Sequence, residues 1–205
     1  MSFESTLRMN IMEAARDMSK GGTRFATFRT SECNARYWHL TNKGGFLLRE
    51  GIAPAKGIRN IYSQGKRYAF ECAVAIVIIF YKAVLDTIGE KSFNTLFPNL
   101  LLYSWDADSD LGLSTRYVPY NYAVPGDVLY FRNPDVDRDT TEWQGENVIK
   151  LGKDLYYGHG LGIRNADAMI KALNRHRIEG SERSAYLDNQ ITAPDYRYLS
   201  RYASR

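Results

Sequence analysis

Apolar side chains recur at helical spacing near the start of the chain. The positions that follow this spacing are Leu7, Ile11, Ala14, Ala15 and Met18. Because they would form one stripe on a helix and Gly21-Gly22 follows them, the pattern predicts an amphipathic helix over residues 5–19. Short runs of strand type come next, separated by polar or Gly-Gly turns, at residues 24–28, 36–40 and 46–49. Residues 53–63 form a candidate short helix.

The longest apolar segment runs from Tyr68 to Ile88 and contains neither glycine nor proline. Gly89 closes the segment. Its length favours a buried helix over a strand, although β-branched residues are frequent in it. This segment is the predicted central helix.

Strand candidates cluster after the central helix, at residues 100–105, 127–131, 146–151 and 155–163. Residues 166–177 carry apolar positions at helical spacing and predict a surface helix. A second short helix is expected at 182–189, and residues 191–205, rich in arginine and tyrosine, are expected to be a loosely held tail. Helices followed by clustered strands indicate the α+β class, with residues 1–205 in a single domain.

The composition is that of a globular protein. Hydrophobic residues make up 44% of the chain and charged residues 24%, which disfavours disordered, collagen-like and coiled-coil classes. The net charge of +4 does not require a nucleic-acid partner. The longest uninterrupted apolar run, Cys72–Tyr81, is shorter than the roughly 20 residues that a membrane span needs, and the start of the chain lacks a signal-peptide pattern. We therefore expect no membrane association.

Two cysteines, Cys33 and Cys72, are too few for a disulfide framework and indicate free thiols in the cytosol. Cys72 lies at or near the start of the central helix, where the helix dipole and unpaired N–H groups favour the thiolate, the form that attacks carbonyl carbon. The alternative is a small core cysteine, because free cysteine is among the most buried residue types. Cys33 lies in a polar stretch without a dipole. Glu71 would project away from Cys72 and is expected to be a cap or salt-bridge residue.

A predicted hairpin brings a carboxylate and an imidazole together. Gly152-Lys153 suits a two-residue type II′ turn. Counting outward from this turn places Glu146 directly opposite His159, with Cβ atoms roughly 5 Å apart. Such a pair can hold an imidazole tautomer and share proton transfer if Cys72 approaches it. The alternative is a cross-strand ion pair worth under about 1 kcal/mol.

Other candidate groups have weaker support. His39 lies in an apolar strand and His176 on an exposed helix, so structural or solvated roles are expected for both. No cysteine and histidine spacing resembles a zinc site and no glycine run makes a phosphate loop, so neither a metal nor a cofactor is expected. Trp105 and Trp143 could exclude water from a thioester and form an apolar passage for an amine, or could be core residues, whereas Trp38 is expected in the core.

Together these residues resemble the bacterial spore-coat transglutaminases of bacilli, the protein-glutamine γ-glutamyltransferases. The resemblance extends over most of the chain and rests on motifs that are specific in combination. These motifs are Leu7–Ile11, Phe25–Phe28, Tyr68–Ala73, Asp86–Glu90, Trp143 with Gly145–Ile149, Gly158–Ile163 and Ser184–Leu187.

The resemblance implies that Cys72 is the nucleophile, with Glu146 and His159 as its catalytic partners. It implies calcium-independent acyl transfer from the γ-carboxamide of a protein-bound Gln to the ε-amine of a Lys, through a thioester on the cysteine and with release of ammonia. The candidate substrate-binding residues are aromatic: Phe25, Trp105 and Trp143.

The implied partners are proteins that supply Gln and Lys, in particular coat proteins. The implied location is the mother-cell cytoplasm during synthesis and then the spore coat or surface. Relative to the members from Bacillus, the chain is expected to lack an N-terminal segment.

Segments 125–131 and 159–163 also look like the core of papain-like, NlpC-type cell-wall peptidases, in which a Cys-bearing helix packs on a small antiparallel sheet. Glu146 on an intervening strand departs from the peptidase pattern. Two alternatives stay open at this point: a cysteine amidase or peptidase of the same fold, and a coat component without catalytic activity.

Overall fold

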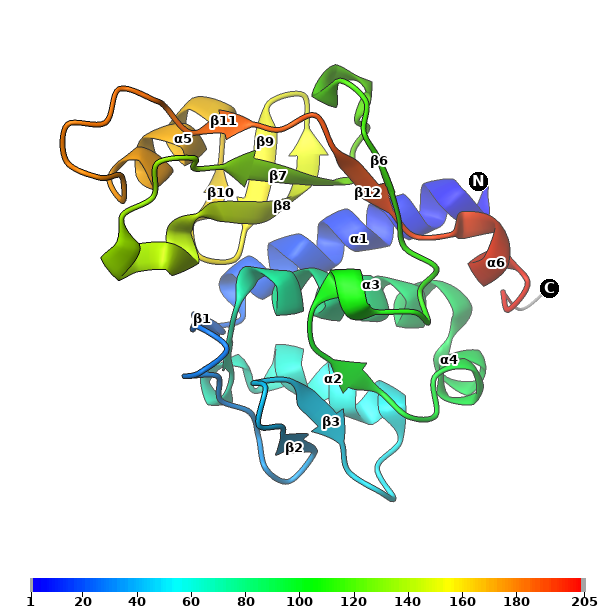
Figure 1. The fold of residues 1–205 in the computed structure, drawn as a ribbon. Helices are drawn as coiled ribbons and strands as arrows, with labels where there is room; N and C mark the ends of the chain where they lie inside the picture. Colours follow the sequence, from blue (N-terminus) through cyan, green and yellow to red (C-terminus); the bar gives the residue numbers. More distant parts are fainter. Residues whose placement is uncertain (1, 204–205) are drawn as a thin grey trace.

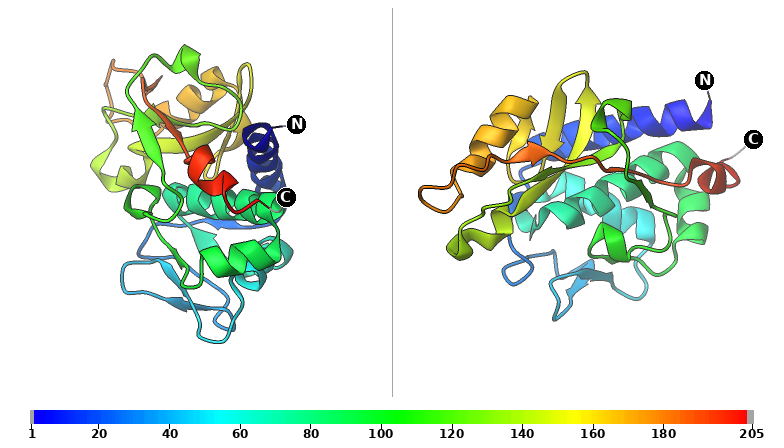
Figure 2. Two further views of the ribbon diagram at one scale, coloured as in Figure 1. Left: turned by 90° about the vertical axis from the view of Figure 1, so that its right-hand side faces the viewer. Right: turned by 45° about the horizontal axis from the view of Figure 1, so that its top comes forward.

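The computed structural model describes residues 2–203 as an α+β fold (Figures 1 and 2). The helices are α1 (Phe3–Lys20), α2 (Pro54–Ser63), α3 (Cys72–Ile88), α4 (Glu90–Leu96), α5 (Ala166–Asn174) and α6 (Tyr196–Ser200). The strands are β1 (Arg24–Phe25), β2 (Trp38–Leu40), β3 (Phe46–Leu48), β4 (Ala69–Phe70), β5 (Leu101–Leu102), β6 (Ser114–Arg116), β7 (Val128–Arg132), β8 (Gly145–Gly152), β9 (Leu155–Gly158), β10 (Gly162–Arg164), β11 (Tyr186–Leu187) and β12 (Ile191–Ala193). The predicted α+β class is confirmed.

Helix α3 is the centre of the fold. It is apolar on every side, and nearly all of its residues are buried, so it needs partners all around. It packs on α1, on strand β8 and on α2, and Figure 1 shows it between the sheet above and α2 below. The segment predicted for the central helix is correct in position, but the helix begins only at Cys72 because Ala69 and Phe70 form β4, which pairs in parallel with β1.

The main sheet is antiparallel and has the order β10-β9-β8-β7-β12-β6, with β11 also paired to β7. One face packs on α1 and α3. The other face is covered by α5, and a second apolar cluster that includes Leu129, Val148 and Met169 lies between them. The expected packing of a Cys-bearing helix on an antiparallel sheet is thus confirmed.

Three sequence predictions in the last third of the chain are wrong. The segment 182–189 is not a helix: Tyr186 and Leu187 form β11, because they complete the edge of β7. The predicted strand 155–163 is divided by a turn into β9 and β10. The predicted loose tail instead inserts β12 between β7 and β6 and buries Ile191 and Leu199 completely. Residues 204–205 of that tail lie outside the described residues.

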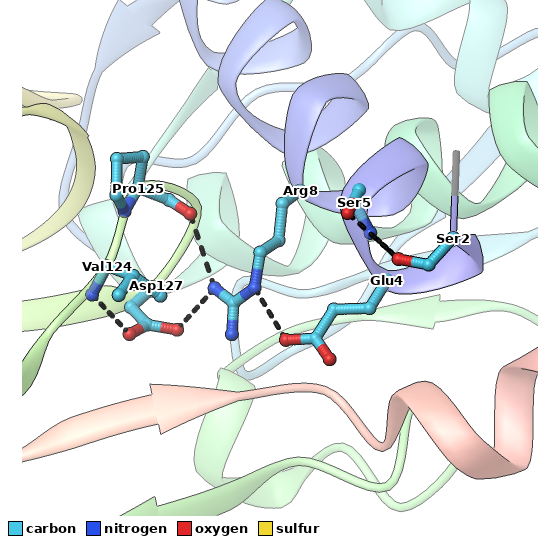
Figure 3. A network of polar contacts seen from close by, with 7 residues as sticks. All are labelled: Ser2, Glu4, Ser5, Arg8, Val124, Pro125 and Asp127. Atoms are coloured by element: carbon cyan, nitrogen blue, oxygen red, sulfur yellow. Dashed lines mark hydrogen bonds and ion pairs between the residues drawn. The ribbon is translucent and has the colours of Figure 1, made fainter.

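Arg8 anchors helix α1 to the loop before β7 (Figure 3). Its Nη1 donates to Oδ1 of Asp127 at 2.7 Å and to the carbonyl of Pro125 at 3.2 Å, while its Nε donates to Glu4 at 2.8 Å. The Asp127 side chain is fully buried, and its Oδ2 accepts the N–H of Val124. The charge of this buried carboxylate is therefore balanced, and β7, the neighbour of β8, is fixed against α1.

Candidate functional site

Cys72 is the first residue of α3, directly after a strand and a cap. The backbone of Glu71 is extended, and its Oε2 accepts the N–H of Ala73 at 2.6 Å, which caps the helix. Cys72 is only 2% exposed, yet it lines a cavity of about 810 Å³. The thiol is therefore buried but accessible from a cavity, whereas a cysteine of the core would have no access to solvent.

The cavity is formed by five parts of the chain: the loop after β1, the start of α3, residues 104–106, strands β7 and β8 with residues 141–144 before β8, and Gln190. Its wall carries positively charged, negatively charged and neutral polar side chains. The lining includes Thr27, Arg29, Glu71, Trp105, Asp106, Tyr130, Arg132, Glu142 and Asn147. A cavity of this size can hold a long side chain presented by another protein.

The thiol of Cys72 has two polar neighbours. It donates to Oε1 of Glu71 at 3.2 Å, and Nδ2 of Asn147 lies 3.4 Å from its sulfur. Burial raises the pKa of the thiol well above its ordinary value, and the charges of Glu146 and Glu71 raise it further, whereas hydrogen bonds from Asn147 lower it. The thiolate expected from the helix dipole is thus not the resting form, because burial and two carboxylates outweigh the dipole.

The carboxyl of Glu146 is held on β8 and is 1% exposed. Its Oε1 accepts the N–H of Gly160 at 3.2 Å. Burial raises the pKa of this carboxyl to about 8, an effect that the charge of Glu71 adds to and that the backbone N–H groups of Gly160 and His159 oppose. A carboxyl with this pKa can give or take a proton near neutral pH.

The predicted pairing of Glu146 with His159 is wrong by one residue. The turn falls on Lys153 and Asp154, so Gly152 pairs with Leu155, and a bulge between Lys150 and Gly152 then shifts the register. None of the described non-glycine residues has a positive φ, and Gly152 does not have one either, so the turn is not of the II′ type. A β-bulge increases the local twist of the two strands and adds one unpaired residue, so the residues beyond it pair one position further along.

The ring nitrogens of His159 are bound to partners other than Glu146. Its Nε2 lies 3.0 Å from the carbonyl of Arg24, which can only accept, so Nε2 carries the proton and Nδ1 accepts from the hydroxyl of Tyr157 at 3.1 Å. The ring stacks on Phe70 with a centroid distance of 4.4 Å. Burial lowers its pKa to about 4, so the ring is neutral. His159 contributes to Glu146 through its backbone N–H.

The three aromatic candidates divide into two groups. Trp105 lines the cavity and donates its indole N–H to Oδ1 of Asn147 at 3.1 Å. Phe25 and Trp143 instead stack on each other, with a centroid distance of 5.0 Å. Both rings lie against Gly160, where an added Cβ would meet Trp143 at 2.9 Å and Phe25 at 3.3 Å. They therefore cover the backbone whose N–H holds Glu146.

Sequence reasoning missed two groups at the thiol, Glu71 and Asn147. Glu71 caps the helix, as the sequence predicts, but its side chain does not point away from Cys72, because its second carboxylate oxygen accepts from the thiol. The cap position was itself the available signal, because an N-cap side chain turns back over the first helical turn. Asn147 had no comparable signal, since only the register of β8 directs its side chain to the helix.

The remaining chemical groups lie outside the site. Trp38 is fully buried, as expected. Burial raises the pKa of the Cys33 thiol to about 11, so this cysteine is a poor nucleophile. His39 is exposed on β2. His176 follows α5 rather than lying on it and stacks on Trp143 at 4.7 Å.

Within residues 2–203, none of the helices combines the length and the apolar character that a membrane span requires. In the same range, no three His, Cys, Asp or Glu side chains form a group that could hold a metal ion.

Comparison with known proteins identifies similar chains over the full length. The sequence model of a family described as protein-glutamine gamma-glutamyltransferase matches residues 1–203. A protein of that name from Bacillus mycoides (strain KBAB4) is 48% identical over 203 residues, which are 99% of this chain and 73% of that protein. The one from Bacillus cereus (strain G9842) is 47% identical over 100% of this chain and 73% of its own length.

Among solved structures, a transglutaminase from Geobacillus stearothermophilus without its C-terminal extension superposes with a TM-score of 0.95. It is 49% identical in sequence, and the match covers 99% of this chain and 96% of that one.

Proposed function

Since the chain belongs to the protein-glutamine gamma-glutamyltransferase family, we propose that it crosslinks proteins without calcium, through a thioester on Cys72. The acyl donor is the γ-carboxamide of a protein-bound Gln, the acceptor is the ε-amine of a Lys, and ammonia is released. The observation that carries this mechanism is the contact of 3.2 Å between the Cys72 thiol and the Glu71 carboxylate at the wall of an accessible cavity.

Glu71 is the proposed base for the thiol. Because the pKa of the thiol is raised, the sulfur must lose its proton as it attacks. The thiol already donates to Oε1 of Glu71, so the proton has a short path while the S–C bond forms. The carboxylate keeps its other oxygen on the N–H of Ala73 throughout.

Glu146 is the proposed acid for the leaving group. With a pKa of about 8 it holds a proton at neutral pH, and it can donate that proton to the departing nitrogen as the C–N bond breaks. Ammonia leaves, and Glu146 becomes a carboxylate. It then accepts a proton from the incoming Lys amine, while protonated Glu71 returns its proton to the sulfur. Both carboxyls are thereby restored after one turnover.

His159 is proposed to act through its position rather than by taking a proton. Both ring nitrogens are occupied, by Tyr157 and by the carbonyl of Arg24, and the ring is neutral. Its backbone N–H and that of Gly160 hold the Glu146 carboxyl. The histidine thus supports the acid and base that the reaction uses.

The aromatic residues are proposed to favour amine over water. Trp105 lines the cavity through which the Gln side chain would reach Cys72. The stacked Phe25 and Trp143 lie over the backbone beside Glu146. An apolar cover at this point admits the alkyl chain of a lysine and limits access of water to the thioester.

The biological substrates are proposed to be spore-coat proteins, with synthesis in the cytoplasm of the mother cell and action at the spore coat or surface. The resemblance to the spore-coat transglutaminases and the Bacillus origin of similar proteins support this proposal. Neither a nucleic acid nor a membrane has a role in it.

The test combines a Gln-containing protein with a fluorescent alkyl amine in the presence of a calcium chelator. The native chain is expected to attach the label to the protein and to release ammonia. The Cys72→Ala variant is expected to do neither. Ammonia without label would indicate a cysteine amidase, peptide cleavage without label would indicate a peptidase, and no product at all would indicate a coat component without catalysis.

A further inference from the structure

Asn147 hydrogen-bonds the nucleophile, and the mechanism above gives it no role. It is 8% exposed on β8, it lines the cavity, and its Nδ2 lies 3.4 Å from the sulfur of Cys72. Burying an amide is costly unless both of its ends have partners. A polar residue at this point of the wall therefore calls for an explanation.

Trp105 fixes which end of the amide faces the sulfur. An indole N–H can only donate, so the atom of Asn147 that it contacts at 3.1 Å must be the oxygen Oδ1. The NH₂ group is then directed to Cys72. The side-chain amide of Asn147 is thus oriented with its donor toward the reacting sulfur before any substrate enters.

We propose that Asn147 is a catalytic residue that donates to the oxyanion formed on the substrate, an inference that rests on the acyl transfer proposed above. When the sulfur of Cys72 attacks the γ-carboxamide, the S–C bond forms, the electron pair of the C=O bond moves onto oxygen, and the thiol proton passes to Glu71. That oxygen is two bonds from the sulfur, so a donor in contact with Sγ is within reach of it. The second donor is the backbone N–H of Cys72, which has no acceptor within its own helix.

The amide distinguishes the transition state from the resting state. At rest it faces a neutral thiol, and sulfur is a weak acceptor. On attack it faces an oxygen that carries a full negative charge, to which hydrogen bonds are roughly twice as strong. Only an interaction that strengthens in this way accelerates the chemical step. Collapse of the intermediate then restores the C=O bond as ammonia leaves with the proton of Glu146.

Trp105 is, in this scheme, a positioning residue for the amide. Trp105→Phe keeps an aromatic ring but removes the indole N–H, so the amide of Asn147 can rotate and present oxygen to the site. The expected loss is smaller than that caused by removing the amide itself, because a fraction of the molecules keeps the donor in place.

The experiment measures acylation and alkylation of the same sulfur in the full chain. Acylation is followed by ammonia release from a Gln-containing protein in a single turnover, with the enzyme in excess, which reports the first step whether amine or water takes the acyl group. Alkylation is followed with iodoacetamide, which is attacked at a CH₂ carbon and forms no oxyanion. For Asn147→Ala we expect the single-turnover rate constant at saturation to fall by about 10²–10³-fold, with the half-saturating concentration within about 3-fold. Because the amide also lowers the pKa of the thiol, alkylation is compared as the limiting rate constant of the thiolate at high pH, which should stay within about 3-fold of the native value.

Asn147→Asp is the second variant, because it keeps the size of the side chain and an acceptor for Trp105 while it removes the NH₂ donor. Its negative charge should raise the pKa of the thiol further, as those of Glu146 and Glu71 do, so both rates are again compared at the high-pH limit. Asn147→Asp should show the same loss of acylation as Asn147→Ala. The proposal can therefore still be tested if the Asn147→Ala protein folds poorly. Acylation within about 3-fold of native in either folded variant would overturn the proposal. An equal loss in acylation and alkylation would overturn it as well, because it would assign Asn147 to the thiol alone.

The two proposals fail in different ways. If the native chain releases ammonia but transfers no amine, the crosslinking function fails while the role of Asn147 is still measured by ammonia release. If the native chain releases no ammonia although iodoacetamide modifies Cys72, both proposals are refuted together.

Discussion

The carboxylate of Glu71 caps helix α3 and at the same time contacts the thiol of the next residue, Cys72. One oxygen accepts the N–H of Ala73 at 2.6 Å and the other lies 3.2 Å from the sulfur. The side chain can reach both because the N-cap backbone is extended and its side chain turns back over the first turn of the helix. The nucleophile and its nearest carboxylate are therefore positioned by one local structure.

Replacing Glu71 should separate capping from proton transfer. In Glu71→Gln the side chain still offers an oxygen to Ala73, but the base is lost, so amine incorporation should fall by about 10²-fold or more. The pKa of the Cys72 thiol should fall, because one of the charges that raise it is removed. The pH dependence of iodoacetamide alkylation measures this change. Glu90→Gln, at an exposed helix start, is the control, and an unmoved alkylation profile would exclude an electrostatic role for Glu71.

Glu146 should set the upper pH limit of the acylation step. Its carboxyl has a pKa of about 8 in the folded chain, so the proton donor is present below that pH and is lost above it. Ammonia release by the native chain should decline as the pH rises through 8. Glu146→Gln should be slow at all pH values and lack that decline. A native profile that stays flat to pH 9.5 would contradict the assignment.

His159 should make the fold sensitive to mild acid. Burial lowers its pKa from 6.5 to about 4, so between these values the unfolded chain binds a proton that the folded chain excludes. Stability is unaffected above pH 7 and is lost as the pH falls through this window, by on the order of 3 kcal/mol at pH 4. Urea unfolding at pH 7 and pH 4.5 should show a smaller loss in His159→Gln than in the native chain. His39→Gln, at an exposed position, should behave like the native chain.

Arg8 should matter more for stability than an exposed arginine. The Asp127 side chain is fully buried, and Arg8→Met would leave its charge without a cation. Loss of one partner of a buried pair costs about 3–5 kcal/mol. Arg59→Met, which breaks an exposed pair with Glu90, should cost under about 1 kcal/mol. Equal urea midpoints for the two variants would show that the contact to Asp127 carries little stability.

Trp143 should govern the choice between amine and water. Trp143→Ala removes one ring of the stack that lies against Gly160, so water should reach the thioester more easily. We expect a larger share of the reacted Gln to become Glu, measured by mass spectrometry at a fixed amine concentration. Tyr117→Ala, at an exposed tyrosine, is the control. An unchanged ratio of Glu to crosslinked product would remove the proposed role of the stack.

Several local features could be predicted because neighbouring residues decide them. The apolar stripe of α1 and the uninterrupted apolar run of α3 specify helices wherever they pack, and the charge and shape of Glu71 specify a cap. The segments after residue 180 could not be predicted in this way. Tyr186, Leu187 and Ile191 are strand residues only because β7 and β6 offer them edges, and those edges come from distant parts of the chain.

The local pattern of residues 68–88 is enough to place a thiol at the start of a buried helix, because neighbouring residues form that helix. The surroundings of the thiol depend instead on contacts between distant parts of the chain. A turn on Lys153 and Asp154 and a bulge beside Gly152 moved the β8–β9 pairing by one residue, so the ring of His159 does not meet Glu146. Tertiary packing also raised the pKa of both Cys72 and Glu146, since burial is a property of the whole fold and not of any segment.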